Sequence, residues 1–125
     1  MERTQKRHTL ISEEDIARKV KELGQQITRD YPDKDKKLIV ISVLKGAMVF
    51  TADLIRSIKR PVTLEVLIAG SYGAQMESSG TVNLKYFSFD TLEDADVILV
   101  DDITDTGRTL LAIGKTLESY KPASL

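Results

Sequence analysis

The run Leu38–Val43 is β-branched and apolar almost throughout, without the alternation of polar and apolar residues that a half-exposed strand shows. Such a run is typical of a strand that is buried on both faces, as in a parallel sheet covered by helices. Val97–Val100 is a shorter run of the same kind, and Val62–Ile68 is a third candidate strand. The sequence therefore predicts an α/β fold with a mainly parallel sheet flanked by helices.

Three helical patterns alternate with these strands. The first begins at Ser12, which is placed to cap the first turn, with Asp15 at the acidic position of a capping box. Ile11 and Ile16 are placed as a hydrophobic staple across this cap. The first pattern ends at Tyr31-Pro32, the second ends before Pro61, and the third spans Leu110–Tyr120. The apolar positions at helical spacing are Ile16, Val20, Leu23 and Ile27 in the first pattern, and Phe50, Leu54, Ile55 and Ile58 in the second.

The remaining segments are loops and less regular strands. Residues 69–80 contain three glycines and three serines, and a loop of this length is usually functional or disordered. Thr81–Phe89 is expected to form a half-exposed strand, and Pro122–Leu125 has the character of an approach to a further strand. We expect one domain, residues 1–125, on the prior of roughly 100–200 residues per domain.

Composition excludes several classes of function. Lys+Arg 18 against Asp+Glu 19 gives no basic surplus for nucleic acid or an anionic membrane. The absence of cysteine excludes disulfides, a thiolate nucleophile and a cysteine zinc site, and His8 is the single histidine, to which we assign no role. No apolar run is long enough to span a bilayer, and the basic N-terminus lacks the apolar region of a secretory signal, so a cytoplasmic location is expected.

Residues 101–109 carry the most informative chemistry. Ligands of open α/β sheets bind beyond the carboxyl ends of the strands, and this segment directly follows the strand Val97–Val100. Backbone N–H groups at the start of the following helix favour a phosphate, and Gly107 lets the backbone approach it closely. The three carboxylates of the segment, Asp101, Asp102 and Asp105, suit sugar hydroxyls or Mg²⁺. The segment therefore predicts a ligand that has both a phosphate and a polyol.

Residues 101–109 also have other interpretations. Asp, Thr and Gly are common turn and capping residues, so simple helix capping accounts for such a turn about one time in three. A receiver domain has an acidic pair after its first strand, but only 24 residues follow Asp101. Ile103 stands where an EF-hand needs an oxygen ligand. Neither a P-loop nor a dinucleotide-binding glycine motif is present.

The segment VILVDDITDTGRTL is similar to the phosphoribosyl-pyrophosphate (PRPP) signature of type I phosphoribosyltransferases. Within that superfamily the chain resembles the hypoxanthine-guanine phosphoribosyltransferases. The matching stretches, in the family's order, are LISEEDIARKVKELGQQITRDY, ISVLKGAMVFTADLIRSI, and the SYG and SSG of the 69–80 loop. The resemblance implies the type I phosphoribosyltransferase fold and purine salvage, in which PRPP and hypoxanthine or guanine give IMP or GMP and pyrophosphate (EC 2.4.2.8).

The resemblance also implies roles for particular residues. Asp101 and Asp102 would bind the ribose hydroxyls, directly or through Mg²⁺. Asp105 would exchange a proton with the purine ring nitrogen as general acid or base. The residues that would hold the 5′-phosphate are Asp105, Thr106, Gly107, Arg108 and Thr109. Pyrophosphate would be bound by Lys45 and Gly46, in a loop with a cis peptide bond. The loop that closes over the site would contribute Ser71 and Tyr72.

Two departures from the family pattern qualify the resemblance. Asp101 stands where the family usually has glutamate. In the family, the residues that contact the purine come after the third helix, whereas this chain ends at Pro122–Leu125. We therefore expect a shortened family member in which the last strands are missing. Whether this shortened chain is active is left open. Base preference is therefore open, and a homodimer or homotetramer is expected for the full-length form. The alternatives are a non-catalytic regulator that binds PRPP or nucleotide, and an inactive fragment.

Overall fold

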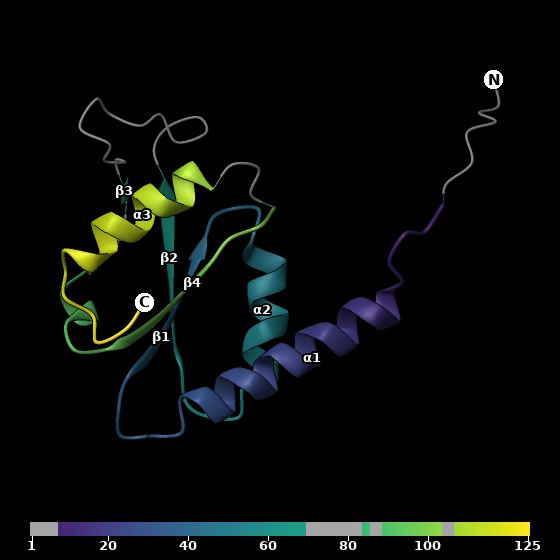
Figure 1. Ribbon diagram of the computed structural model, residues 1–125, viewed down its shortest axis with the longest axis horizontal. Helices are drawn as coiled ribbons and strands as arrows, with labels where there is room; N and C mark the ends of the chain where they lie inside the picture. Colours follow the sequence, from purple (N-terminus) through teal and green to yellow (C-terminus); the bar gives the residue numbers. More distant parts are fainter. Residues whose placement is uncertain (1–7, 70–83, 86–88, 104–106) are drawn as a thin grey trace.

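The computed structural model describes residues 8–69, 84–85, 89–103 and 107–125. The chain forms a sheet with helices on both faces (Figure 1). In chain order the elements are α1 (Glu13–Asp30), β1 (Leu38–Val43), α2 (Met48–Ser57), β2 (Thr63–Ala69), β3 (Leu84–Lys85), a short 3-10 helix (Phe89–Leu92), β4 (Asp96–Val100) and α3 (Arg108–Glu118).

The sheet has the order β3-β2-β1-β4, and β1 runs parallel to both of its neighbours. Leu38 pairs with Asp96 of β4, and Ile39 pairs with Thr63 of β2. Only the short β3 is antiparallel, against the end of β2. This arrangement confirms the predicted mainly parallel α/β fold. Figure 1 looks onto the sheet from its β4 edge, with β4 in front and β3 at the back.

The core lies on both faces of β1, which explains the unbroken apolar run. All six residues of β1 are buried. Ile39, Ile41 and Val43 pack in one cluster with Ile113 and Leu117 of α3. On the opposite face Leu38 and Val40 pack with Ile27 of α1 and with Leu54 and Ile58 at α2. The sheet is therefore the middle of three layers, with α3 on one side and α1 and α2 on the other.

The first helix begins where the sequence predicts, but only part of its apolar face is covered. Ser12 Oγ accepts a hydrogen bond from the Asp15 N–H at 3.1 Å, which confirms the expected cap. Ile27, near the C-terminal end, is buried, whereas Ile16 is 53% exposed and Leu23 is 38% exposed. The N-terminal half of α1 extends past the sheet (Figure 1). Helical spacing therefore predicted the apolar face of α1 correctly, but the sheet does not cover the N-terminal part of this face.

Two expected boundaries differ in the structure. Of the expected strand Thr81–Phe89, the described residues form only β3 and the start of the 3-10 helix at Phe89, and the others lie outside the described residues. The strand prediction was thus wrong at Phe89. The third helix starts at Arg108, two residues before the expected Leu110. At the chain's end, Ser124 forms an isolated parallel bridge with Asp96, which confirms the expected approach to a strand.

Within the described ranges, no helix combines the length and apolar character needed to cross a membrane.

The two helices on one face meet at Gly24, which leads to a stability prediction. A Cβ atom at Gly24 would lie 2.6 Å from the backbone carbonyl carbon of Ser57, so α1 and α2 would have to separate. We expect Gly24→Ala to lower the free energy of unfolding by about 1–3 kcal/mol, although alanine is the better helix former. Urea denaturation followed by circular dichroism measures the change.

Gly114→Ala provides a matched control within α3. Its new Cβ would meet only Leu125 Cδ2, at 3.8 Å, which is ordinary van der Waals contact. This variant should gain stability, by up to about 1 kcal/mol, from helix propensity. Equal stability of the two variants would show that Gly24 is not a close-packing position.

Candidate functional site

Three loops follow the carboxyl ends of the neighbouring strands β1, β2 and β4. Because these strands are parallel, their carboxyl ends lie at the same edge of the sheet, where α/β proteins bind ligands. Residues 44–47 follow β1, and the acidic segment that begins at Asp101 follows β4. The loop after β2, with the predicted Ser71 and Tyr72, lies outside the described residues.

The loops after β1 and β4 come into direct contact at Gly46. A Cβ atom built on Gly46 would lie 2.7 Å from Cγ of Asp102 and 3.3 Å from its Cβ. The absence of a side chain at Gly46 therefore lets the Asp102 carboxylate lie against the β1 loop. Gly46 and Asp102 are far apart in the sequence and were predicted to be parts of one site. The structure brings these two residues together.

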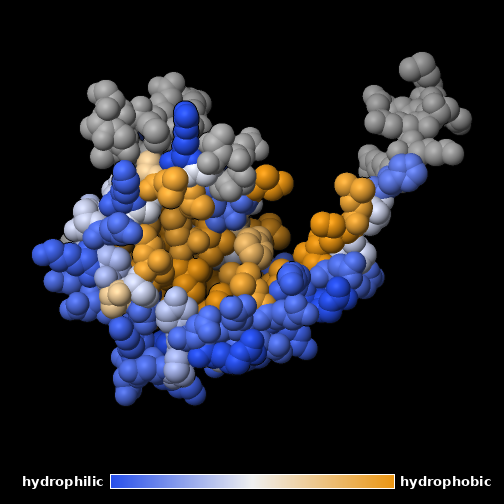
Figure 2. Space-filling view, in the orientation of Figure 1, coloured by the Kyte–Doolittle hydropathy of each residue, from blue (hydrophilic) through white to orange (hydrophobic). Residues whose placement is uncertain are grey.

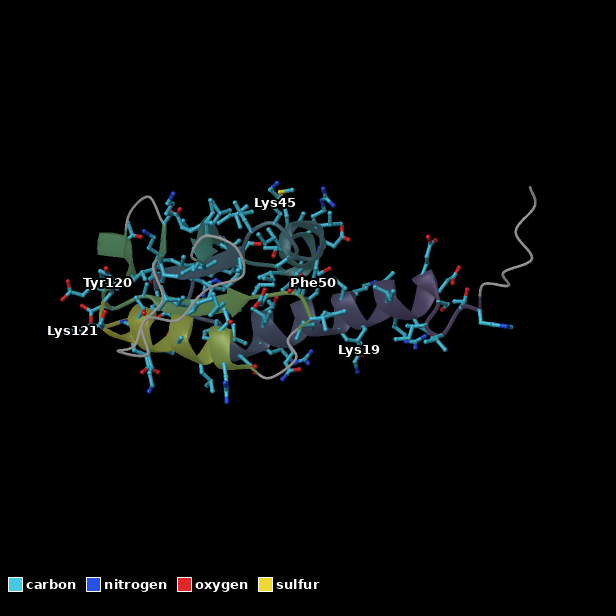
Figure 3. The ribbon with its side chains drawn as sticks, turned by 90° about the horizontal axis from the view of Figure 1, so that it is seen from above. Lys19, Lys45, Phe50, Tyr120 and Lys121 are labelled. Carbon is cyan, nitrogen blue, oxygen red and sulfur yellow. The ribbon has the colours of Figure 1, made fainter. Side chains whose placement is uncertain are left out.

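The β1 loop has the conformation that the resemblance implied. The peptide bond between Leu44 and Lys45 is cis. Lys45 is exposed and stands before α2, on the same side of the molecule as that helix (Figure 3). Its ammonium group is available to an anion in solution.

Asp101 and Asp102 form an acidic pair with unequal surroundings. Asp101 Oδ1 accepts a hydrogen bond from the Asp102 N–H at 2.8 Å. Burial raises the pKa of the Asp101 carboxyl above its ordinary value of 3.8, and the neighbouring charge of Asp102 raises it further, against the lowering effect of the backbone hydrogen bond. A cation or a sugar hydroxyl beside Asp101 would stabilise its charged form.

The start of α3 follows the acidic pair in the chain and begins at a glycine. Gly107 is the N-cap residue and has φ 75°, a left-handed conformation that glycine adopts without steric cost. Its carbonyl accepts the first helical hydrogen bond, from the Leu111 N–H at 2.9 Å. N–H groups at the start of an α-helix favour a phosphate, and Arg108 and Thr109 belong to the first turn of α3. Asp105 and Thr106 lie outside the described residues.

Sequence reasoning missed a buried hydroxyl pair beneath the β1 loop. Thr51 is 1% exposed, and its Oγ1 lies 2.7 Å from the Ala47 carbonyl oxygen and 2.8 Å from Ser42 Oγ. This pair ties the end of β1 to the first turn of α2, on the two sides of Lys45 and Gly46. The signal was present in the sequence, because Ser42 and Thr51 are polar residues within apolar patterns.

The acidic pair fits Mg²⁺ only together with ligand oxygens. Among the residues that the structure describes, no group of three or more His, Asp or Glu side chains could hold a metal by itself. Mg²⁺ is commonly held by one or two carboxylates and completed by substrate phosphates and water. Asp101 and Asp102 supply that number of carboxylates, and they are adjacent in the chain directly after β4. The residues therefore fit the metal.

The fold and this site define a class of protein. The sequence profile described as "Phosphoribosyl transferase domain" matches residues 9–125, and the chain belongs to this family. The resemblance read from the PRPP signature is thereby confirmed.

The individual relatives to which the chain is similar are hypoxanthine-guanine phosphoribosyltransferases. The chain is 40% identical over 122 residues to a hypoxanthine-guanine phosphoribosyltransferase of Dictyostelium discoideum, covering 95% of this chain and 67% of the relative. For the enzyme of that name from Streptococcus thermophilus (strain CNRZ 1066) the identity is 43%, with 92% of this chain and 62% of the relative covered. A Bacillus anthracis hypoxanthine-guanine phosphoribosyltransferase structure superposes with a TM-score of 0.81 at 43% identity, covering 97% and 70% of the two chains. The chain thus spans about two thirds of the length of these relatives.

Proposed function

We propose that this chain carries the PRPP-binding part of a purine salvage enzyme that transfers ribose 5-phosphate to hypoxanthine or guanine. The observation that carries the proposal is the contact of Gly46 with Asp102. A loop suited to pyrophosphate lies against an acidic pair suited to ribose. The N-terminus of α3, which is suited to phosphate, follows this pair in the chain. PRPP has these three parts, in this order around one sugar ring. The names of the relatives favour transfer over the non-catalytic regulator.

The binding roles follow from the position of each group. The first turn of α3, with Gly107, Arg108 and Thr109 and the neighbouring Asp105 and Thr106, would hold the 5′-phosphate. Asp101 and Asp102 would accept hydrogen bonds from the ribose 2′- and 3′-hydroxyls. Lys45 and the backbone at Gly46 would bind the pyrophosphate group, with the Ser42–Thr51 pair supporting the loop from below.

Two further roles complete the proposed reaction. Asp105 would exchange a proton with a purine ring nitrogen while the purine forms its new bond to C1 of the ribose and pyrophosphate leaves. Ser71 and Tyr72, in the loop after β2, would cover the site and exclude water, which prevents hydrolysis of PRPP. Mg²⁺ beside Asp101 and Asp102 would neutralise charge on the pyrophosphate and so favour its departure. A single domain, a cytoplasmic location and assembly into homodimers or homotetramers belong to the same proposal.

Binding of PRPP should depend on Mg²⁺. Asp101 and Asp102 would repel a highly anionic ligand unless a cation lies between them. We expect isothermal titration to show PRPP binding in the presence of Mg²⁺ and an affinity at least about tenfold weaker in EDTA, a change of ~1.4 kcal/mol. Asp94→Asn, at the other end of β4, should leave this dependence unchanged. Equal affinity with and without EDTA would contradict a metal role.

Substitution of Gly46 tests the contact between the two loops. The methyl group of Gly46→Ala requires Asp102 to move away from the β1 loop. We expect PRPP affinity to fall about 10- to 100-fold, with a smaller change in the free energy of unfolding, because Gly46 and Asp102 are exposed. Titration calorimetry and urea denaturation measure the two effects. Unchanged affinity would mean that the two loops do not share a ligand.

A further inference from the structure

We propose that Ser42 and Thr51 are positioning residues, whose buried hydroxyls hold the β1 loop (residues 44–47) in place for the pyrophosphate group of PRPP. Neither side chain is placed to touch a ligand, because both are covered by the core. The inference rests on the proposed function, in which Lys45 and the backbone at Gly46 bind pyrophosphate. Two hydroxyls outside the loop would then set the position of these binding groups.

The two hydroxyls are exceptions in an apolar interior. Ser42 is 2% exposed and Thr51 is 1% exposed, and the other five residues of β1 are apolar. Apolar side chains gather at the sheet between α1 and α3 (Figure 2). A hydroxyl moved from water into such surroundings costs free energy unless it forms a hydrogen bond. Each hydroxyl therefore needs a partner, and the two oxygens lie 2.8 Å from one another.

The pair also bonds to a backbone group of the β1 loop. Thr51 Oγ1 lies 2.7 Å from the carbonyl oxygen of Ala47. Threonine has one hydroxyl hydrogen and a carbonyl oxygen can only accept, so the Thr51 O–H donates to Ala47. The Ser42 O–H then donates to Thr51 Oγ1. The two bonds form a chain of hydrogen bonds from the end of β1, through α2, to the residue that follows Gly46.

Stability alone does not account for a polar pair at this place. Two apolar side chains of similar shape would fill the same space without the desolvation of two hydroxyls, and such replacements can be nearly neutral for stability. What the hydroxyls add is the bond to Ala47, whose carbonyl also accepts the Thr51 N–H at 2.8 Å. Ala47 is buried and is the N-cap residue of α2, and alanine has no side-chain oxygen that could cap the helix. The Thr51 hydroxyl therefore holds the start of α2 against β1.

Lys45 and Gly46 lie between two fixed points of the β1 loop. On one side, the Leu44 N–H donates to the Leu67 carbonyl of β2 at 2.9 Å. On the other side, Ala47 is held by the hydroxyl chain. The two residues between these points are exposed, and Gly46 lies against the acidic pair. A displacement of Ala47 would therefore move the groups proposed for pyrophosphate, whereas the start of α3, proposed for the 5′-phosphate, belongs to another loop.

Titration calorimetry of the 125-residue chain with two parts of PRPP tests this role. The probes are inorganic pyrophosphate and ribose 5-phosphate, each with Mg²⁺. We expect Thr51→Val to weaken pyrophosphate binding about tenfold and to change ribose 5-phosphate binding by less than about twofold, because only the β1 loop loses a fixed point. Thr51→Ser keeps the hydroxyl, and its affinity for both compounds should remain within about threefold of the parent chain.

Thr28→Val is the matched control. Thr28 Oγ1 donates to the carbonyl four residues earlier, that of Gly24, at 2.8 Å, as Thr51 does to Ala47. It also accepts the Lys59 N–H at 2.9 Å, so the variant loses two hydrogen bonds between α1 and the end of α2. Loss of these bonds should lower the free energy of unfolding, measured by urea denaturation. Pyrophosphate affinity should stay unchanged, because neither bond reaches the β1 loop.

Amide hydrogen exchange gives a measurement that needs no ligand. The Ala47 and Met48 N–H groups each form a backbone hydrogen bond at the β1 loop, at 3.4 Å and 3.1 Å. We expect Thr51→Val to speed exchange of these two amides about fivefold or more through local opening. Exchange of the Leu111 amide, in α3, should follow only the change in global stability. The comparison separates a loosened loop from a destabilised chain.

Three results would overturn the inference. The first is exchange of Ala47 and Met48 in Thr51→Val that is unchanged relative to Leu111. The second is a pyrophosphate affinity that stays the same in this variant, or that falls only as much as the ribose 5-phosphate affinity. The third is a Thr51→Ser variant that binds pyrophosphate as weakly as Thr51→Val, which would assign the effect to packing. A parent chain that binds neither compound would instead contradict the proposed function, and the exchange comparison would then decide whether the hydroxyls hold the loop.

Discussion

Replacing Asp105 with asparagine is expected to lower kcat by ~10²–10⁴, the range for loss of a general acid or base. The neighbouring Asp101 and Asp102 would be engaged by the ribose, so neither is placed to exchange a proton with the purine. Asparagine keeps a similar shape and still forms hydrogen bonds. PRPP affinity should therefore change by less than about threefold, a free-energy difference below ~0.7 kcal/mol.

The measurement uses an extended form of the chain. In this form, the whole part of the Bacillus anthracis relative that follows the position matched to Leu125 is fused after Leu125. Formation of IMP and GMP is followed at saturating PRPP, and PRPP affinity is measured by calorimetry. Asp94→Asn is the matched control, because it makes the same chemical change at the opposite end of β4. An Asp105→Asn variant within about twofold of the parent would show that Asp105 only shapes the turn.

The second large expected effect is a low rate of nucleotide formation by the 125-residue chain. We expect it to form IMP or GMP ~10²–10⁴ times more slowly than the extended chain. The resemblance places the aromatic that stacks on the purine, and the lysine that contacts its exocyclic oxygen, after the third helix. Stacking contributes ~1–3 kcal/mol per base, and a hydrogen bond from a charged donor a similar amount.

Binding of PRPP should respond differently from turnover. The groups proposed to bind PRPP lie within the 125 residues, so the two chains should bind it with similar affinity. Initial rates and titration calorimetry on both chains make the comparison. Similar rates in the two chains would mean that the purine site is formed by other residues of this chain.

The sequence predicted the parts of the fold that depend on burial. β1 was identifiable because both of its faces are covered, which leaves no alternation. β4 was identifiable because its residues contribute to the core clusters on both sides of the sheet. The cap at Ser12 was identifiable because it uses local hydrogen bonds. The strand Thr81–Phe89 was overpredicted at Phe89, because β propensity does not show where pairing with β2 ends.

For the candidate site, sequence reasoning could assign residue types but not their contacts. The approach of Gly46 to Asp102 joins residues far apart in the chain, and it follows from the parallel pairing of β1 with β4. The Ser42–Thr51 pair depends on how α2 packs over β1. The exposure of Ile16 could not be predicted from helical spacing, which identifies an apolar face but not what covers it.

The strand order also governs when the site can form as the chain folds. Leu38 of β1 pairs with Asp96 of β4, and nearly half of the chain lies between them. Closing such a long loop costs entropy before any contact compensates for it, so the pairing of β1 with β4 is expected to form late. Because Asp101 and Asp102 follow β4, they reach Gly46 only after this step. During synthesis from the N-terminus, the chain would therefore acquire the proposed ligand site only after Asp101 and Asp102 have left the ribosome.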